Sequence, residues 1–148
     1  GLKVAPFYGC HILRPADVIG FDDPENPHSF EDLIVTLGAE PVKYEGRVKC
    51  CGFPILFVKE GPANKMAGLQ LQEAVNEGAD VMATPCPLCH ISLDTYQSSA
   101  AKEVEKDLHL PVLHLPQLIG LALGFKKDDL GLSRHMVSAD SVLRKIPV

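Results

Sequence analysis

The spacing of five cysteines constrains this sequence more than any other feature. The set consists of Cys10, the adjacent Cys50 and Cys51, and the Cys86-x-x-Cys89 pair. An odd number of cysteines in a chain without secretory features disfavours a disulfide framework, which uses its cysteines in pairs. The pattern instead favours metal binding or redox chemistry in a reducing compartment, and we expect the cytoplasm.

Short apolar runs alternate with helical patterns along the chain. Ser29 and Asp32 form a capping-box pattern ahead of a helix over 30–37, and Gly38 is a natural helix stop. Parallel strands need crossover connections, which helices provide. The sequence therefore predicts an α/β domain with a mainly parallel sheet covered by helices. The expected strands are 2–8, 40–44 with an extension over 47–50, 80–84 and 112–114. The further expected helices are 62–77, one that opens at 86–89, and 117–123. The buried face of the helix over 62–77 is expected to contain Met66, Leu69, Ala74 and Val75.

Each cysteine group follows a predicted strand. In a parallel sheet the loops beyond the carboxyl ends of the strands gather in one crevice, where cofactors are usually held. We therefore expect the five cysteines to converge on one centre. Gly9 and Gly52 adjoin two of the groups, and they serve either as turn residues or to let the backbone approach a cofactor closely.

Several kinds of site fit the cysteines. Adjacent side chains such as Cys50 and Cys51 project in different directions, so a cluster with several irons accommodates both better than one small ion does. Structural zinc needs four thiolates and would leave one cysteine spare. A thioredoxin-like exchange site at Cys86 and Cys89 would leave three cysteines idle. Burial of all five as small hydrophobic residues is the remaining interpretation.

The histidines offer weaker signals. His11 and His90 each follow a cysteine directly, so each is either a partner that tunes the centre by hydrogen bonding to sulfur or a partly exposed loop residue. His109 and His114 follow the Cys-x-x-Cys pair in a finger-like order, but Pro111 opposes the helix that a zinc finger requires. We interpret both as ordinary core or surface residues.

Composition excludes several functions. The 148 residues carry a formal net charge of −5 and no run of Lys or Arg, which argues against nucleic-acid binding. The longest apolar stretch, 111–125, contains two prolines and is too short to span a membrane. Phosphate-cradling glycine loops, His-Glu-x-x-His and Gly-x-Ser-x-Gly are all missing from the sequence.

The cysteine pattern and its flanks resemble a known family over nearly the whole chain. A cysteine, a long gap, Cys-Cys-Gly, a second long gap and Cys-x-x-Cys are the pattern of the cysteine-rich CCG domains. Within that family the chain is similar to the C-terminal half of the CCG-containing subunit of heterodisulfide reductase. The similarity rests on Tyr8-Gly9-Cys10-His11, the segment 21–27, Cys50-Cys51-Gly52, Cys86-Pro87-Leu88-Cys89, and the segments 115–124 and 132–135.

The resemblance implies a cofactor and partners. In such a subunit each half holds a noncubane four-iron, four-sulfur (4Fe-4S) cluster, and a disulfide substrate lies between the halves. By position, Cys10, Cys50, Cys51, Cys86 and Cys89 would all be cluster ligands. The implied partners are a second CCG half and a ferredoxin-like iron-sulfur subunit.

The resemblance also leaves an alternative open. The family includes subunits of succinate dehydrogenases, fumarate reductases and glycolate or lactate oxidases, and some members hold zinc, so a zinc-stabilised interaction domain is the second interpretation. Residues 1–148 would form a single CCG domain. Because Gly1 leads directly into a strand and only one ligand set is present, we expect a fragment or half of a longer subunit, incomplete alone as an oxidoreductase.

Overall fold

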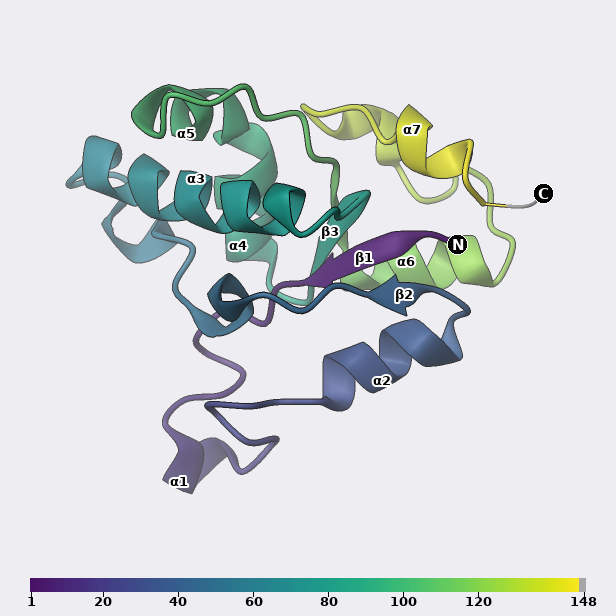
Figure 1. The fold of residues 1–148 in the computed structure, drawn as a ribbon, viewed down its shortest axis with the longest axis horizontal. Coiled ribbons are helices and arrows are strands. Elements are labelled where there is room, and N and C mark those ends of the chain that lie inside the picture. Colours follow the sequence, from purple (N-terminus) through teal and green to yellow (C-terminus); the bar gives the residue numbers. More distant parts are fainter. Residues whose placement is uncertain (147–148) are drawn as a thin grey trace.

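The computed structural model describes residues 1–146. Its centre is a four-stranded sheet in the order β2-β1-β3-β4, and every neighbouring pair of strands is parallel (Figure 1). The predicted α/β class with a parallel sheet is therefore confirmed. The strands are β1 (Lys3–Pro6), β2 (Glu40–Pro41), β3 (Val81–Thr84) and β4 (Val112–His114).

Helices cover both faces of this sheet. On one face the core is built from α3 (Glu60–Asn76), α4 (Pro87–His90) and α5 (Gln97–Glu103). On the other it is built from α2 (Ser29–Thr36), α6 (Leu115–Ala122) and α7 (Asp140–Leu143). The remaining helical segments are α1 (Ala16–Ile19), a π-helix (Ile91–Thr95) and three 3-10 turns, Glu45–Val48, Phe53–Ile55 and Leu132–Arg134.

The strands are apolar on both sides because both sides are covered. Val4 and Ala5 are both fully buried, but Val4 packs with the α2 and α6 layer and Ala5 with the α3 layer. Successive residues of a strand point to opposite faces, and a sheet covered on both faces favours apolar residues on both sides of its central strands. The continuous apolar runs in the sequence reflect this burial.

The expected strand over 47–50 is wrong. Residues Glu45–Val48 form a 3-10 turn instead. The amides of Glu45 and Gly46 donate to the Glu73 carboxylate on α3, at 2.8 and 3.1 Å. These amides are therefore satisfied by a side chain from a helix and have no need of a neighbouring strand.

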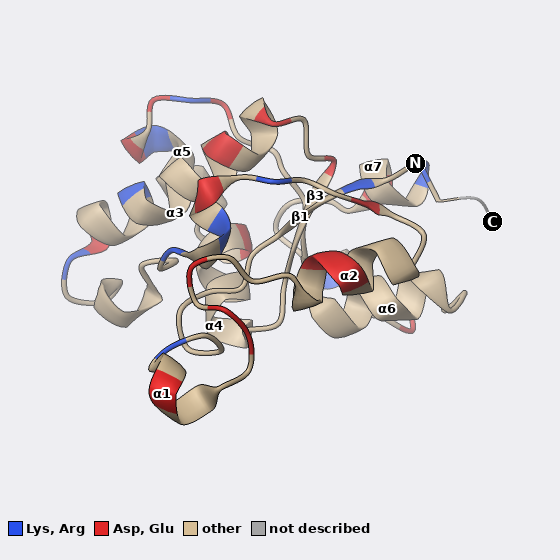
Figure 2. Ribbon diagram, turned by 60° about the horizontal axis from the view of Figure 1, so that its bottom comes forward, with Lys and Arg blue, Asp and Glu red and all other residues tan. Residues whose placement is uncertain are grey.

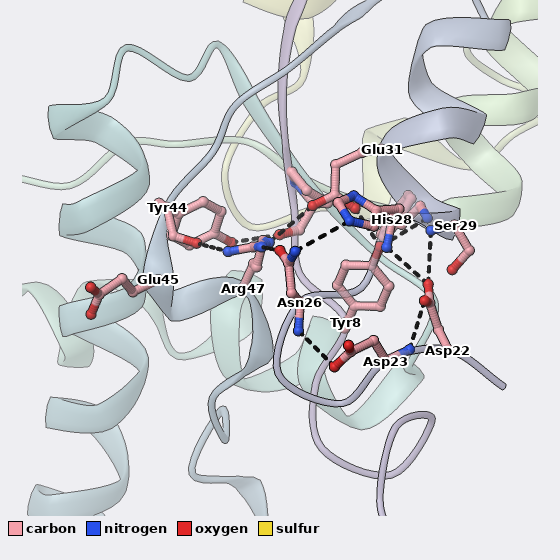
Figure 3. A network of polar contacts seen from close by, with 12 residues as sticks. Tyr8, Asp22, Asp23, Asn26, His28, Ser29, Glu31, Tyr44, Glu45 and Arg47 are labelled. Carbon is pink, nitrogen blue, oxygen red and sulfur yellow. Dashed lines mark hydrogen bonds and ion pairs between the residues drawn. The ribbon is translucent and has the colours of Figure 1, made fainter. Parts of the chain in front are cut away.

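The predicted capping box at Ser29 and Asp32 is also wrong. Helix α2 begins at Ser29 without a side-chain cap from its flanking residue. Asp22 takes that role from outside the helix, since its Oδ2 accepts hydrogen bonds from the amides of His28 (2.9 Å) and Ser29 (2.8 Å; Figure 3). A capping carboxylate can thus come from a loop that sequence spacing does not identify.

Helix α3 buries a different face from the predicted one. Of the four residues expected there, Leu69 and Val75 are exposed and only Ala74 is fully buried. The buried positions include the small residues Ala63 and Ala67 together with Leu71. Small side chains let α3 pack closely against α5, its main helical neighbour, so size decided this face more than hydrophobicity did.

Candidate metal centre

The cysteine loops meet at a topological switch point of the sheet. Strands β1 and β3 are neighbours in the order β2-β1-β3-β4, and the chain leaves β1 toward β2 on one side and leaves β3 toward β4 on the other. In parallel α/β sheets a crevice opens at such a point, beyond the carboxyl ends of the strands. Here it contains a cavity of about 250 Å³ lined by Tyr8, Cys10, His11, Ile12, Pro85, Cys86 and Cys89.

The Cys86-x-x-Cys89 pair is positioned by the end of β3. The Cys86 amide donates to the hydroxyl of Thr84 at 3.3 Å, which fixes the turn. Pro87 then starts α4, where its lack of an amide hydrogen is harmless. Cys86 is half-buried, whereas Cys89 is buried on the inner side of the turn. The pair therefore presents one sulfur near the surface and one in the core.

Two glycines let the other loops approach closely. Gly52 has a φ of 84°, and a Cβ there would lie 2.5 Å from the backbone oxygen of Ala63, so the Cys-Cys-Gly corner accepts no side chain at this position. Gly9 has a φ of 73°, and a Cβ there would lie 2.9 Å from the sulfur of Cys89. The β1 loop and the Cys-x-x-Cys turn are thus in direct contact.

The adjacent cysteines face different neighbours. Burial raises the pKa of Cys10, and the nearby Cys50 and Cys51 thiols raise it further. Hydrogen bonding from Cys89, opposed by burial, lowers the pKa of Cys51 to about 6. The same bond raises the pKa of Cys89, as do burial and Cys86.

The structure thus brings all three cysteine groups together. Cys10 lies near Cys50 and Cys51, Cys51 is hydrogen-bonded to Cys89, and Cys89 in turn interacts with Cys86. Several thiolates held this closely repel one another, and a bound cation would remove that repulsion. The donor set therefore suits a thiophilic metal.

The structure decides between the two interpretations of the histidines. The Nε2 of His90 bonds to the carbonyl of Val112 at 2.9 Å and not to a sulfur. His11 is exposed at the rim of the cavity. His109 is exposed and pairs with Asp107, which confirms its interpretation as a surface residue, while His114 lies half-buried beside His90.

Sequence reasoning missed polar residues that follow the Cys-x-x-Cys turn. Ser92 is buried, and its hydroxyl helps to lower the pKa of Cys51 by hydrogen bonding. Asp94 is buried near His135, a residue far away along the chain. The only available signal was polarity within an otherwise apolar helical stretch, since both residues alternate with Ile91 and Leu93.

A second polar network holds the loop that carries Cys10 (Figure 3). The Tyr8 hydroxyl donates to Glu31, whose other oxygen pairs with Arg47 at 2.9 Å. Arg47 also donates to the backbone carbonyl of Tyr44 at 2.8 Å and to Asn26 at 3.2 Å. Burial and the neighbouring Glu31 raise the pKa of Tyr8, so its hydroxyl remains a hydrogen-bond donor. These bonds tie the loop after β1 to α2 and to the segment before Cys50.

Acidic residues dominate the segment beside this loop. From α1 through α2 the ribbon carries Asp and Glu without Lys or Arg (Figure 2). Val18, Ile19 and Phe21 of the same segment are exposed. The rim of the site next to Cys10 is therefore both acidic and apolar.

Comparison with known proteins identifies relatives of this fold and motif. The family model "CCG: Cysteine-rich domain" matches residues 4–94, which include all five cysteines. The 8-methylmenaquinol:fumarate reductase membrane anchor subunit of Wolinella succinogenes is 46% identical over 93% of this chain and 49% of its own. A subunit of the ferredoxin:CoB-CoM heterodisulfide reductase of Methanosarcina mazei is 36% identical over 98% of this chain and 49% of its own.

A solved structure supports the fold alone. A hypothetical protein from Helicobacter pylori superposes with a TM-score of 0.71 at 19% identity, over 93% of this chain and 24% of that one. The chain spans about half the length of the curated relatives it matches. Within the described residues, no helix combines the length and the apolar character needed to cross a membrane. Fold, cysteine pattern and family match agree, and the chain belongs to the cysteine-rich CCG domain family.

Proposed function

We propose that residues 1–148 form one half of a subunit in a heterodisulfide-reductase-like complex, and that its five cysteines hold a noncubane 4Fe-4S cluster. The domain would pass electrons toward a disulfide or a related substrate. The observation that carries the proposal is the proximity of five thiols from three loops. Cys10, Cys86 and Cys89 line one cavity, Cys50 lies near Cys10, and Cys51 is hydrogen-bonded to Cys89. Relatives named as reductase subunits support the redox class.

The donor set fits an extended cluster better than a single ion. Cys50 interacts with Cys10 on one side, and Cys51 interacts with Cys89 on the other. Because the sulfurs of Cys50 and Cys51 interact with different cysteines, one small tetrahedral ion could bind only some of the five thiolates. When bound, an iron-sulfur cluster would supply electron-transfer capacity at a potential set by its surroundings.

The protein would control access and polarity around that centre. Cys51 and Cys89 are buried and would fix the inner side, while Ser92 donates toward Cys51 and would tune its sulfur. Pro85, His11 and Ile12 line the cavity and would form the substrate face. Cleavage of a disulfide to two thiols takes two electrons, so the second half would complete the site.

The acidic and apolar rim beside Cys10 suits a partner. Its exposed side chains include Val18 and Phe21, and its carboxylates would attract a basic surface. We assign this face to the second CCG half or to a ferredoxin-like iron-sulfur subunit. The match to only half of each curated relative supports such an arrangement.

Anaerobic reconstitution tests the cluster. The chain is reduced, supplied with ferrous iron and sulfide, and assayed for bound iron and acid-labile sulfide. We expect both to be bound, and both to be lost in Cys51→Ala but retained in Ser133→Ala, an exposed control. The isolated chain should show weak turnover with a reduced dye and a heterodisulfide. Failure of the folded chain to take up iron and sulfide would overturn the proposal.

Zinc is the second candidate. The observation in its favour is the relative named as a membrane anchor subunit, since an anchoring role does not by itself require electron transfer. Four of the five thiols would then close a tetrahedral site. Stoichiometric zinc in the folded chain, with iron and sulfide both absent after reconstitution, would select this alternative.

A further inference from the structure

A second group of potential metal ligands lies next to the cysteines but contains none of them. His90 ends α4, Asp94 lies in the π-helix that follows, and His135 comes directly after the 3-10 turn Leu132–Arg134. One ligand atom from each of the three residues lies within 4.8 Å of the others. Two imidazoles and a carboxylate are donors that zinc and other divalent transition metals accept.

The hydrogen bond of His90 leaves one of its nitrogens free for a metal. Its Nε2 lies 2.9 Å from the carbonyl oxygen of Val112. A carbonyl oxygen only accepts, so Nε2 carries the proton and Nδ1 keeps its lone pair. Metal-bound histidines commonly donate their other ring N–H to a backbone carbonyl in this way. His90 is therefore already held in the tautomer that a metal requires.

His135 supplies a buried nitrogen with no partner. Its ring lies edge-on to that of His90, with centroids 4.8 Å apart. Within residues 1–146 the Nδ1 of His135 is buried and makes no hydrogen bond. An unsatisfied buried polar atom costs about 1 to 3 kcal/mol, and such atoms are rare enough in folded proteins to point to a ligand that satisfies them.

Asp94 is a buried carboxylate oriented by the backbone. It is 3% exposed, and its two oxygens accept hydrogen bonds from the amides of Met136 (2.9 Å) and Val137 (3.1 Å). No ion pair within residues 1–146 involves it. Each oxygen retains a further lone pair, so the charge is fixed in direction and still able to bind a cation.

The π-helix accounts for the placement of Asp94. Ser92, Leu93 and Asp94 are buried in succession. The Ser92 side chain hydrogen-bonds to Cys51, whereas the Asp94 carboxylate accepts a hydrogen bond from the amide of Met136, directly after His135. Short π-helical segments occur often at functional sites. The wider turn thus separates a residue that faces the cysteines from one that faces the histidines.

We propose that His90, Asp94 and His135 form a mononuclear site for a divalent transition metal, with Zn²⁺ as the expected ion, separate from the cysteine centre. Three protein ligands leave a fourth position open for water or a substrate atom. Ligand atoms around tetrahedral zinc lie about 3.4 Å apart, so the side chains would draw together by up to about 1.4 Å. The ion would join the segment after α6 to the helix that follows Cys89. This proposal does not depend on what the cysteines hold.

Metal binding to the full-length, reduced chain tests the site. Co²⁺ serves as the spectroscopic probe, because cysteine ligation produces a thiolate-to-cobalt charge-transfer band and a site of nitrogen and oxygen donors does not. Zn²⁺ affinity is measured by competition with a chelator. We expect a non-thiolate Co²⁺ site in the parent, weakened at least about 100-fold in His90→Gln and His135→Gln, since loss of even an outer-shell partner costs 10- to 100-fold.

The matched control is His109→Gln, an exposed histidine outside the group, which should bind as the parent does. Zn²⁺ should raise the unfolding temperature of the parent by more than that of His135→Gln. If a glutamine variant fails to fold, as judged by circular dichroism, Asp94→Asn replaces it. Cobalt or zinc bound only through thiolates, or non-thiolate binding unchanged in folded variants, would overturn the proposal.

Discussion

Two buried polar groups flank the cysteines, and they differ in how well their members are paired. In the Tyr8–Glu31–Arg47 network, the carboxylate of Glu31 receives a donor on each oxygen, and Arg47 has three acceptors (Figure 3). In the His90–Asp94–His135 group, Nδ1 of His135 is buried without a partner within the described chain. A satisfied network can fix structure by itself, whereas an unsatisfied one has capacity left for a ligand.

The difference also appears in what each group connects. The first network ties together segments that precede the CCG corner, and each of its charges is neutralised inside the protein. The second joins Asp94 to backbone more than forty residues later along the chain and contains a negative charge without a cationic partner among residues 1–146. We therefore interpret the first as structural and the second as a binding site.

The largest effect should come from opening the first network. Glu31→Ala leaves the half-buried Arg47 charge and the Tyr8 hydroxyl without their acceptor, so it should lower the free energy of unfolding by about 3 to 5 kcal/mol. Urea unfolding of the metal-free chain measures this. Glu25→Ala, at an exposed ion pair, is the control and should cost less than about 1 kcal/mol. If both substitutions lowered the free energy of unfolding equally, the buried network would contribute no more to stability than an exposed ion pair.

A smaller effect should follow from Asp94→Ala. The substitution removes two charge-assisted hydrogen bonds, but these bonds are only partly buried, so water can replace the carboxylate at the amides of Met136 and Val137. The expected cost without metal is about 2 to 3 kcal/mol, again by urea unfolding. Asp128→Ala, an exposed aspartate, serves as reference. A cost as large as that of Glu31→Ala would mean that the second group is as structural as the first.

Acidification should weaken the cap of α2, beside the first network, through Asp22. Although burial opposes it, hydrogen bonds from Ser29, His28 and Asp23 lower the pKa of Asp22 from 3.8 to about 2. A carboxylate with a depressed folded pKa stabilises above its unfolded pKa, and that contribution is lost as pH falls through the folded value. Because solvent screens this partly exposed carboxylate, we expect about 1 kcal/mol, less than the full shift would give, to be lost between pH 4 and 2. Asp22→Asn should abolish this part of the pH dependence; an unchanged profile would show that another group is responsible.

The smallest effect is expected at His135 when no metal is present. Because its Nδ1 makes no hydrogen bond in the described structure, His135→Ala should change the free energy of unfolding by less than about 1 kcal/mol. With Zn²⁺ added, the gap between parent and variant should widen, since the ion stabilises only the form that binds it. Differential scanning calorimetry with and without Zn²⁺ measures both values. A gap that stays constant would contradict the comparison of the two groups.

Much of the fold could be predicted because its signals are local. The runs before Cys10 and Cys86 became β1 and β3 at nearly the expected positions, since a strand buried on both faces must be continuously apolar. The predictions failed where a distant side chain decided the outcome. Glu73 satisfies the amides at Glu45 and Gly46, and Asp22 caps α2.

The sequence by itself determined the cysteine set and its common location. Cys10 and the Cys86-x-x-Cys89 pair follow β1 and β3, and the carboxyl ends of parallel strands lie at one edge, so local pattern and topology placed these two groups. Cys50 and Cys51 reach the same place through a 3-10 turn that the local pattern did not predict. Only the tertiary structure decided how Cys50 and Cys51 divide between Cys10 and Cys89, and that Asp94 meets His135. Such pairings depend on packing between helices and loops far apart in the chain. Contacts of that kind cannot be predicted from the periodicity of the sequence.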